Sequence, residues 1–283
     1  MTVGLDTDLQ QRLETIFADL NSRAARRAFP APLALASALD EICKTSPDGL
    51  VRVPSHVPAL FATAAVEIWL RAIHSFLISA AVTDASPIWA GISGYYSSHY
   101  CIRAFAHLLG YFQLFRRKRI ACLESAKPMC SFLKKNAAHR EHSFYWRIVK
   151  QHPSFAGDPL FTENLDDADE SDAANRNRTT YGDHLSTALP QFRVLDEAAL
   201  RNRVHHISLI EFDAPPIPRR DRAPDIDAVQ IVAYHRIVRF RRLLDQALGS
   251  KSRFWAIHRR PSWASEWTDF QLVETRRLAG GSS

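Results

Sequence analysis

The short motifs that mark the most common enzyme classes are missing from this sequence. It has no glycine-rich phosphate-binding loop, no Gly-x-Ser-x-Gly turn for a nucleophilic serine, no His-Glu-x-x-His helix and no pair of carboxylates at catalytic spacing. These absences argue against a P-loop nucleotide hydrolase, an α/β-hydrolase, a zinc metalloprotease and a glycosidase-like enzyme.

Disulfide, metal and targeting signals are also scarce. The four cysteines form no compact framework, which favours buried, reduced thiols. The first residues, MTVGLDTDLQQRLE, lack the basic start and apolar run of a signal peptide, so we expect a cytoplasmic protein. A zinc site is a minor alternative, because a cysteine pair precedes a histidine pair, but the gap between the cysteines is wrong for a zinc knuckle. We therefore expect neither metal nor cofactor; the four residues of that alternative are Cys122, Cys130, His139 and His142.

An uninterrupted membrane-spanning run is absent as well. The most apolar window, residues 59–82, is long enough to cross a bilayer, but it contains Glu67, Arg71 and His74. Their spacing of four and three residues places all three on one helical face. This pattern predicts a core helix with a polar seam and no membrane association.

The composition is that of a globular protein with a mild basic excess. The 283 residues are 46% hydrophobic, which is enough for a substantial core, and the formal net charge is +6. The excess is clustered in runs such as residues 116–119 and 239–242. Such runs can hold a polyanion, although most basic runs are solvated faces.

Apolar periodicity predicts a mostly helical chain. Helices are expected at about 7–27, 33–44, 58–82, 86–115, 196–212 and 228–248, with an extended piece at 50–53. Residues 116–190 break this pattern with short period-two runs, at 119–124, 129–134 and 143–150, followed by an acidic loop. The expected organisation is an N-terminal helical arm at 1–55, a helical bundle at 56–115 and 191–250, a β or irregular insert at 116–190, and a tryptophan-containing tail at 251–283.

The segment Ser86–Phe115 is the expected centre of the fold. Ser86 and Pro87 form a favourable helix start. Small side chains follow at helical spacing, which lets a second backbone approach closely. The link to the preceding helix is short, so the two helices must lie antiparallel; the small residues are Ala90, Gly94, Ser97, Cys101 and Ala104.

The stretch Leu200-Arg201-Asn202-Arg203-Val204-His205-His206 carries the best candidate chemistry. On a helix Asn202 and His206 lie one turn apart, with Arg201 beside them. An arginine can stabilise charge on a phosphodiester, a histidine can exchange protons near neutral pH, and an asparagine can fix orientation. With RNA, the substrate's own 2′-hydroxyl can be the nucleophile, so that no metal is required.

This stretch resembles the active-site pattern of the HEPN superfamily, in which Arg and a polar residue, often Asn, precede His by a short spacing. Residues 95–100, Tyr-Tyr-Ser-Ser-His-Tyr, with the following Arg103, are similar to the tyrosine-rich helix of many HEPN bundles. The resemblance implies a four-helix bundle, a homodimer that brings two motifs together, and metal-independent RNA cleavage by Arg201, Asn202 and His206. A toxin or anti-phage defence effector, controlled by an antitoxin or regulatory protein, would fit this class.

The sequence also suggests residues that support the motif, and it leaves a non-catalytic interpretation open. We expect the polar and aromatic neighbours of the motif to bind RNA or to support the catalytic set, namely Tyr96, Tyr100, Arg103, His107, Arg203 and His205. In the alternative interpretation, Arg201 and Arg203 are solvated, His205 or His206 packs against the bundle, and Arg103 and His107 form a buried polar layer with Tyr96, Tyr100 or Glu67. The protein would then be a non-catalytic interaction module, or a module that binds RNA or nucleotides.

Overall fold

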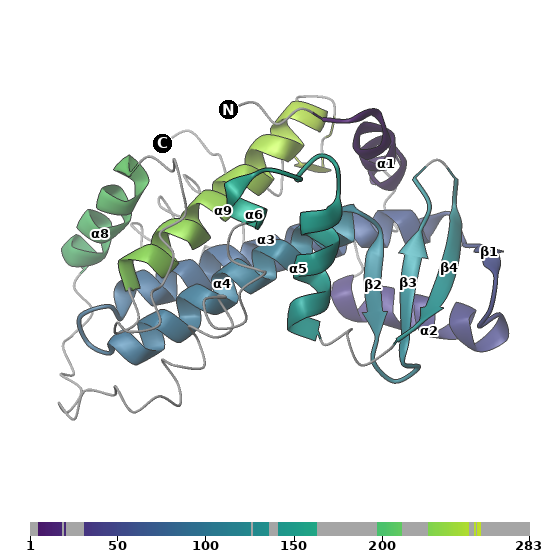
Figure 1. Cartoon of the computed structure of the whole chain (residues 1–283), viewed down its shortest axis with the longest axis horizontal. Coiled ribbons are helices and arrows are strands. Elements are labelled where there is room, and N and C mark those ends of the chain that lie inside the picture. Colours follow the sequence, from purple (N-terminus) through teal and green to yellow (C-terminus); the bar gives the residue numbers. More distant parts are fainter. Residues whose placement is uncertain are drawn as a thin grey trace. The chain divides into compact units, whose positions relative to one another are not determined.

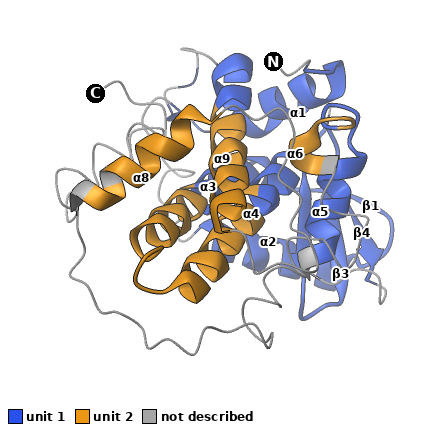
Figure 2. Cartoon of the chain, turned by 60° about the vertical axis from the view of Figure 1, so that its left-hand side comes forward, with its two compact units in different colours: residues 1–69, 102–155, 242–258 blue, residues 70–101, 156–241, 259–283 orange. Residues whose placement is uncertain are grey.

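The protein is mostly helical and carries one small antiparallel sheet, as the sequence predicts. The computed structural model describes residues 5–18, 20, 31–125, 127–135, 141–162, 197–210, 226–248, 252, 254 and 255. The chain divides into two compact units, shown in Figure 2. Unit 1 comprises residues 1–69, 102–155 and 242–258, and unit 2 comprises residues 70–101, 156–241 and 259–283. The boundaries therefore differ from the expected arm, bundle, insert and tail.

Unit 1 begins with a capped amphipathic helix, α1 (Thr7–Phe17). The side chain of Asp6 accepts a hydrogen bond of 2.7 Å from the backbone N–H of Leu9, which satisfies one of the free donors at the helix start. Leu9, Leu13 and Ile16 are completely buried at spacings of four and three residues. The part of the expected helix beyond residue 20 lies outside the described residues.

Unit 1 also contains a four-stranded antiparallel sheet. Strands β1 (Leu50–Arg52), β2 (Tyr111–Leu114), β3 (Arg119–Leu123) and β4 (Met129–Lys134) have the order β1-β4-β3-β2. Helix α2 (Ala31–Thr45) packs against β2, as Figure 1 also shows. The strands at 119–123 and 129–134 confirm the predicted β character. Because β1 pairs with β4, however, the expected N-terminal arm and the expected insert each contribute strands to one sheet, which the sequence does not predict.

Helix α4 (Pro87–Leu108) ends earlier than the prediction of a helix to Phe115. Gly110 has φ +80°, a left-handed conformation that stops the helix at little steric cost. The next four residues form β2 and pair with β3. The apolar spacing continues past the glycine in the sequence, which is why periodicity alone extended the helix.

Helix α5 (Glu141–Gln151) replaces a predicted extended run. Phe144, Tyr145 and Trp146 favour strands by intrinsic propensity, but all three are buried together with Val149. Consecutive buried residues fit the wide apolar arc of a helix on a core, whereas a strand would turn Tyr145 to the opposite face. Tertiary packing therefore overrides propensity here.

The central helix hairpin is confirmed. Within unit 2, α3 (His56–Ala81) and α4 run antiparallel, because Ser79 Oγ donates to Ala90 O at 2.6 Å and Ser97 Oγ donates to Ala72 O at 2.7 Å (Figure 1). Both serines are fully buried, and most of the small residues that the sequence places on this flank of α4 are buried with them. The close approach of the two backbones thus depends on small side chains.

Helix α9 (Ile226–Leu248) supplies the third long helix. Val232, Ile237, Phe240 and Leu244 are buried on it, whereas Val229 is half-buried. In unit 2, the buried Arg236 donates from Nε and NH2 to the carbonyl of Leu160, at 2.9 and 2.8 Å, and so anchors the short helix α6 (Pro159–Thr162). Residues 163–190, the rest of the predicted loop, lie outside the described residues.

The tail residue Trp255 and the apolar helix α3 are both largely buried. Trp255 is completely buried, packs on Trp69 with ring centroids 5.3 Å apart, and donates to Asp245 at 2.7 Å. Among the described residues, α3 is the one helix long and apolar enough to span a bilayer, and 72% of its apolar window is buried. This burial agrees with the predicted core helix; Trp263 and Trp267 lie outside the described residues.

Candidate functional site

Helix α8 (Glu197–Leu209) carries the candidate catalytic residues and belongs to unit 2. Leu200, Val204 and Ile207 are buried, and their spacing defines one apolar stripe. Most of the other residues of the helix are polar, and Leu209 is exposed, so the stripe indicates which side of α8 faces the protein. Asn202, His205 and His206, which lie between the stripe positions, are exposed.

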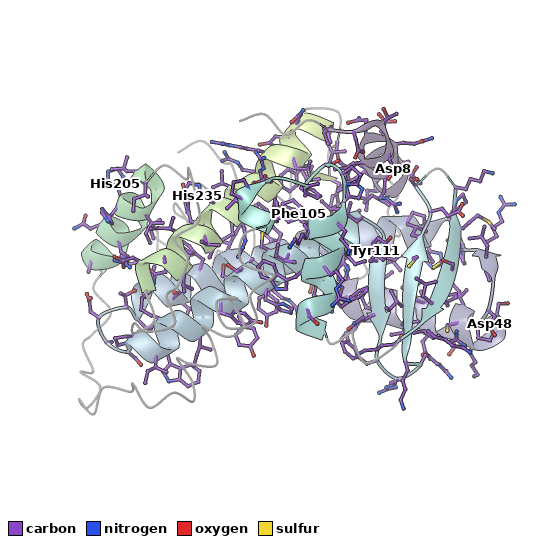
Figure 3. The ribbon with its side chains drawn as sticks, in the orientation of Figure 1. Asp8, Asp48, Phe105, Tyr111, His205 and His235 are labelled. Atoms are coloured by element: carbon purple, nitrogen blue, oxygen red, sulfur yellow. The ribbon has the colours of Figure 1, made fainter. Side chains whose placement is uncertain are left out.

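Two of the three predicted catalytic side chains lie on the exposed side of α8. Asn202 and His206 are both exposed and, four residues apart, they share one helical face. His205 is exposed as well and projects away from the helix (Figure 3). The backbone of Arg201 lies within α8, whereas its side chain is outside the described part of the structure. The alternative in which His206 packs in apolar surroundings is wrong.

Arg203 differs from its neighbours, because its guanidinium is turned towards α9. Nε donates to Gln230 Oε1 at 2.8 Å, and NH2 forms an ion pair with Asp227. Only 21% of the Arg203 side chain is exposed. Its donors thus hold two acceptors of the protein itself, which favours the supporting role of Arg203 over a direct contact with RNA.

The tyrosines of α4 form a row along their own helix. Tyr96 and Tyr100 are half-buried with ring centroids 6.0 Å apart, and Tyr95 contacts Tyr96 at 5.3 Å. Tyr95 also stacks on His99 with an interplanar angle of 8°. The hydroxyl-bearing rings thus support one another, and their use in RNA binding stays a prediction.

His107, on the unit 1 part of α4, is a core residue. It is completely buried, and its Nδ1 lies 2.8 Å from Tyr111 O. Burial lowers the pKa of His107 to about 3; the nearby charge of Arg103 acts in the same direction, and the hydrogen bond to Tyr111 opposes it. The imidazole is therefore neutral near physiological pH and sealed from solvent. A completely buried side chain cannot contact RNA directly, so only the supporting role of His107 stays a prediction.

The alternative of a buried polar layer describes part of this region, because a residue of α5 lies beside both Arg103 and His107. The rings of His107 and Tyr145 meet edge to face with centroids 5.7 Å apart, and the guanidinium carbon of Arg103 lies 5.6 Å from the centroid of the Tyr145 ring. Glu67, one of the suggested partners, accepts a hydrogen bond of 2.7 Å from Ala31 N. Helix α5, which the sequence did not predict as a helix, thus contributes Tyr145 to this layer.

A group of potential cation ligands occurs in unit 1. Ligand atoms of Asp6, Asp8 and His152 lie within 4.8 Å of one another. Asp6, however, already caps α1 and accepts from Ser154 Oγ at 2.7 Å. The fixed cation of Arg12 lies 3.9 Å from Asp8. These contacts are those of a helix cap, and no sequence pattern could indicate them because His152 is remote from both aspartates.

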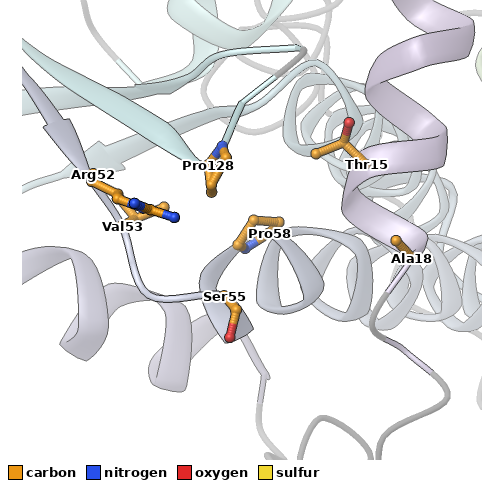
Figure 4. A pocket seen from close by; sticks show the side chains of 7 residues that line it. All are labelled: Thr15, Ala18, Arg52, Val53, Ser55, Pro58 and Pro128. Atoms are coloured by element: carbon orange, nitrogen blue, oxygen red, sulfur yellow. The ribbon is translucent and has the colours of Figure 1, made fainter.

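An open pocket of about 360 Å³ lies elsewhere in unit 1 (Figure 4). Its polar lining residues are Thr15, Arg52 and Ser55, and the others are apolar. The hydroxyl of Thr15 lies within hydrogen-bond distance of the carbonyls of Gln11 and Ser125, at 2.9 and 2.8 Å, and so is occupied. None of the predicted site residues lines this pocket.

The cysteines are free thiols, as predicted. Burial raises the pKa of Cys122 and of Cys130 to about 12, so both are protonated near neutral pH. In the zinc alternative, His139 and the side chain of His142 lie outside the described residues.

The fold and the candidate site define a mostly helical protein with a small sheet and an exposed Asn–His pair on a surface helix. Searches with the whole chain found no matching family model, no matching curated protein and no matching solved structure. The HEPN resemblance therefore depends on the residues of α8 and α4 themselves.

Proposed function

We propose that the protein is a metal-independent endoribonuclease of HEPN type in which α8 presents Arg201, Asn202 and His206 to RNA. The observation that carries the proposal is the exposure of Asn202 and His206 on one face of α8. A catalytic pair must reach the solvent-borne substrate. A structural histidine would instead be packed or hydrogen-bonded inside the bundle.

The chemistry needs only these side chains and the substrate. His206 removes the proton from the 2′-hydroxyl, the 2′-oxygen attacks the adjacent phosphorus, and the bond from phosphorus to the 5′-oxygen breaks. The leaving 5′-oxygen takes up a proton from water, the protonated His206 releases its proton to water, and a 2′,3′-cyclic phosphate remains. Arg201 neutralises the charge that develops on the phosphoryl oxygens, and Asn202 orients the phosphate.

Assembly, regulation and location follow from the same resemblance. A homodimer would bring two Arg–His motifs to one RNA, and a toxin or defence role in the cytoplasm would require a regulatory partner or antitoxin. Size-exclusion chromatography with light scattering tests the dimer. A purely monomeric protein that cleaves RNA would remove this part of the proposal and leave the chemistry intact.

A second candidate is a binding module without catalysis, and an exposed aromatic ring favours it. Trp89, near the start of α4, is 63% exposed. Exposed tryptophan is enriched at interfaces with proteins and with unpaired bases. This candidate predicts affinity for RNA or a protein partner without any cleaved product.

The deciding experiment is incubation of total RNA with the purified protein in excess EDTA. The wild type should produce fragments ending in cyclic phosphate, and His206→Ala should cleave about 10²- to 10⁴-fold more slowly. His56→Ala is the matched control, since it removes another exposed imidazole, at the start of α3, that has no part in the proposed site. Equal cleavage by His206→Ala and the wild type would refute the proposal, and binding without cleavage would select the second candidate.

A further inference from the structure

A continuous chain of hydrogen bonds connects α8 to the helix hairpin inside unit 2. Arg203 Nε donates to Gln230 Oε1 on α9, and Gln230 Nε2 donates to Ser79 Oγ at 2.9 Å and to Thr83 Oγ1 at 2.8 Å on or just after α3. Ser79 Oγ in turn donates to Ala90 O on α4 at 2.6 Å. Four helices are therefore joined through polar atoms.

Gln230, at the centre of this series of hydrogen bonds, is buried. Gln230 is 0% exposed, and its amide oxygen and both of its amide hydrogens have partners. A buried amide that lost one partner would retain its desolvation cost, so the network is favourable in one arrangement only. Asp227 lies three residues before Gln230 on α9 and adds a charge-assisted contact to the Arg203 guanidinium.

We propose that Arg203 is a positioning residue that fixes the orientation of α8, and with it the direction of the exposed Asn202–His206 face. This inference rests on the proposed ribonuclease function. Arg203 directly follows Asn202, so a rotation or shift of α8 that breaks the Arg203 contacts also moves the side chains at 202 and 206. Displacement of a catalytic group by about 1 Å can cost on the order of 10²-fold in rate.

Two features separate this role from a direct contact with RNA. The fork of Arg203 bonds two acceptors at once, a geometry that a lysine ammonium does not reproduce. A phosphate contact, in contrast, is retained in part by lysine, because a point charge is sufficient. Gln230 provides the second distinction between positioning and RNA contact, because a fully buried residue cannot touch RNA.

The test compares Arg203→Lys, Arg203→Ala and Gln230→Met with the wild type in steady-state RNA cleavage. We expect all three variants to lower kcat by about 10- to 100-fold, with KM and the salt dependence of binding nearly unchanged. An RNA contact would give near-normal kcat in Arg203→Lys and in Gln230→Met. It would also raise KM in Arg203→Ala and reduce its salt slope by about one unit. That second pattern would overturn the inference.

Hydrogen exchange keeps the two proposals distinguishable. Arg203→Lys should lower the amide protection of residues 197–209 while α3 and α4 keep theirs, because only the attachment of α8 is weakened. If the wild type does not cleave RNA, the proposed function fails, and the exchange pattern still reports on the role of Arg203. Unchanged protection and unchanged kcat in Arg203→Lys would refute the positioning role.

Discussion

Replacing Gly110 by alanine tests how the long helix α4 is made to end. Gly110 has φ +80° and accepts a hydrogen bond of 2.8 Å from Leu123 N, at the point where the chain turns from α4 into β2. A methyl group added here would lie 2.8 Å from Leu123 O and 3.1 Å from Leu123 Cβ, and it would also press against the Arg12 guanidinium. The first of these neighbours is backbone and cannot rotate away.

The expected cost has two parts. An alanine in the left-handed region costs about 1–2 kcal/mol, offset by about 0.4–1 kcal/mol because alanine also restricts the unfolded chain. Crowding against a packed neighbour adds about 1–3 kcal/mol. Gly49→Ala measures the conformational cost without the crowding cost, since Gly49 has φ +95° and a methyl group there would meet nothing within 4 Å. We therefore expect Gly110→Ala to lower the free energy of unfolding by about 1–3 kcal/mol more than Gly49→Ala does.

Urea denaturation followed by far-UV circular dichroism measures this difference. Both variants should keep the wild-type m-value, so that a shift of the midpoint reports stability alone. If the midpoints of Gly110→Ala and Gly49→Ala differed from the wild type by the same amount, crowding at the end of α4 would not be the reason for the glycine. The cost would then be conformational only.

Two further predictions concern the loss of folding stability at acidic pH. His107 has a folded-state pKa of about 3, so between that value and about 6.5 the unfolded state binds one proton more at this residue than the folded state does. On acidification from about pH 6 to about pH 4, His107 should therefore contribute a fall of about 1.4 kcal/mol per pH unit to the unfolding free energy, and His107→Asn should show a slope that is shallower by about this amount. A slope identical in the variant would contradict the burial argument. For Asp6, burial raises the pKa, but hydrogen bonds from Leu9 and Ser154 and the charge of His152 outweigh it, and the net pKa is lowered. Asp6→Ala should therefore cost about 1 kcal/mol at neutral pH, and this difference should disappear as the pH falls through the lowered pKa; an equal difference at about pH 2 and about pH 7, in thermal unfolding, would refute the assignment.

The parts of the fold that the sequence predicted are those decided by local signals. A short link between two long apolar segments requires an antiparallel hairpin, and small residues on α4 allow Ser97 to reach the backbone of α3. The parts it missed depend on partners far along the chain. Strand β1 exists because it pairs with β4, and Tyr145 lies in a helix because α5 has a core to cover.

The same distinction holds within the candidate site, where adjacent polar residues have different roles. In the sequence Asn202 and Arg203 are both polar neighbours of a short motif, and nothing local separates them. The structure separates them through Gln230, which lies 27 residues from Arg203 and takes its guanidinium into the bundle. Arg203 attaches α8 to the rest of unit 2, so Asn202 and His206 are not needed to hold the helix. This strengthens the case for a functional role of the exposed residues beyond what the motif alone supports. Side chains that a fold does not use for its own stability are the ones whose chemistry is available for a substrate.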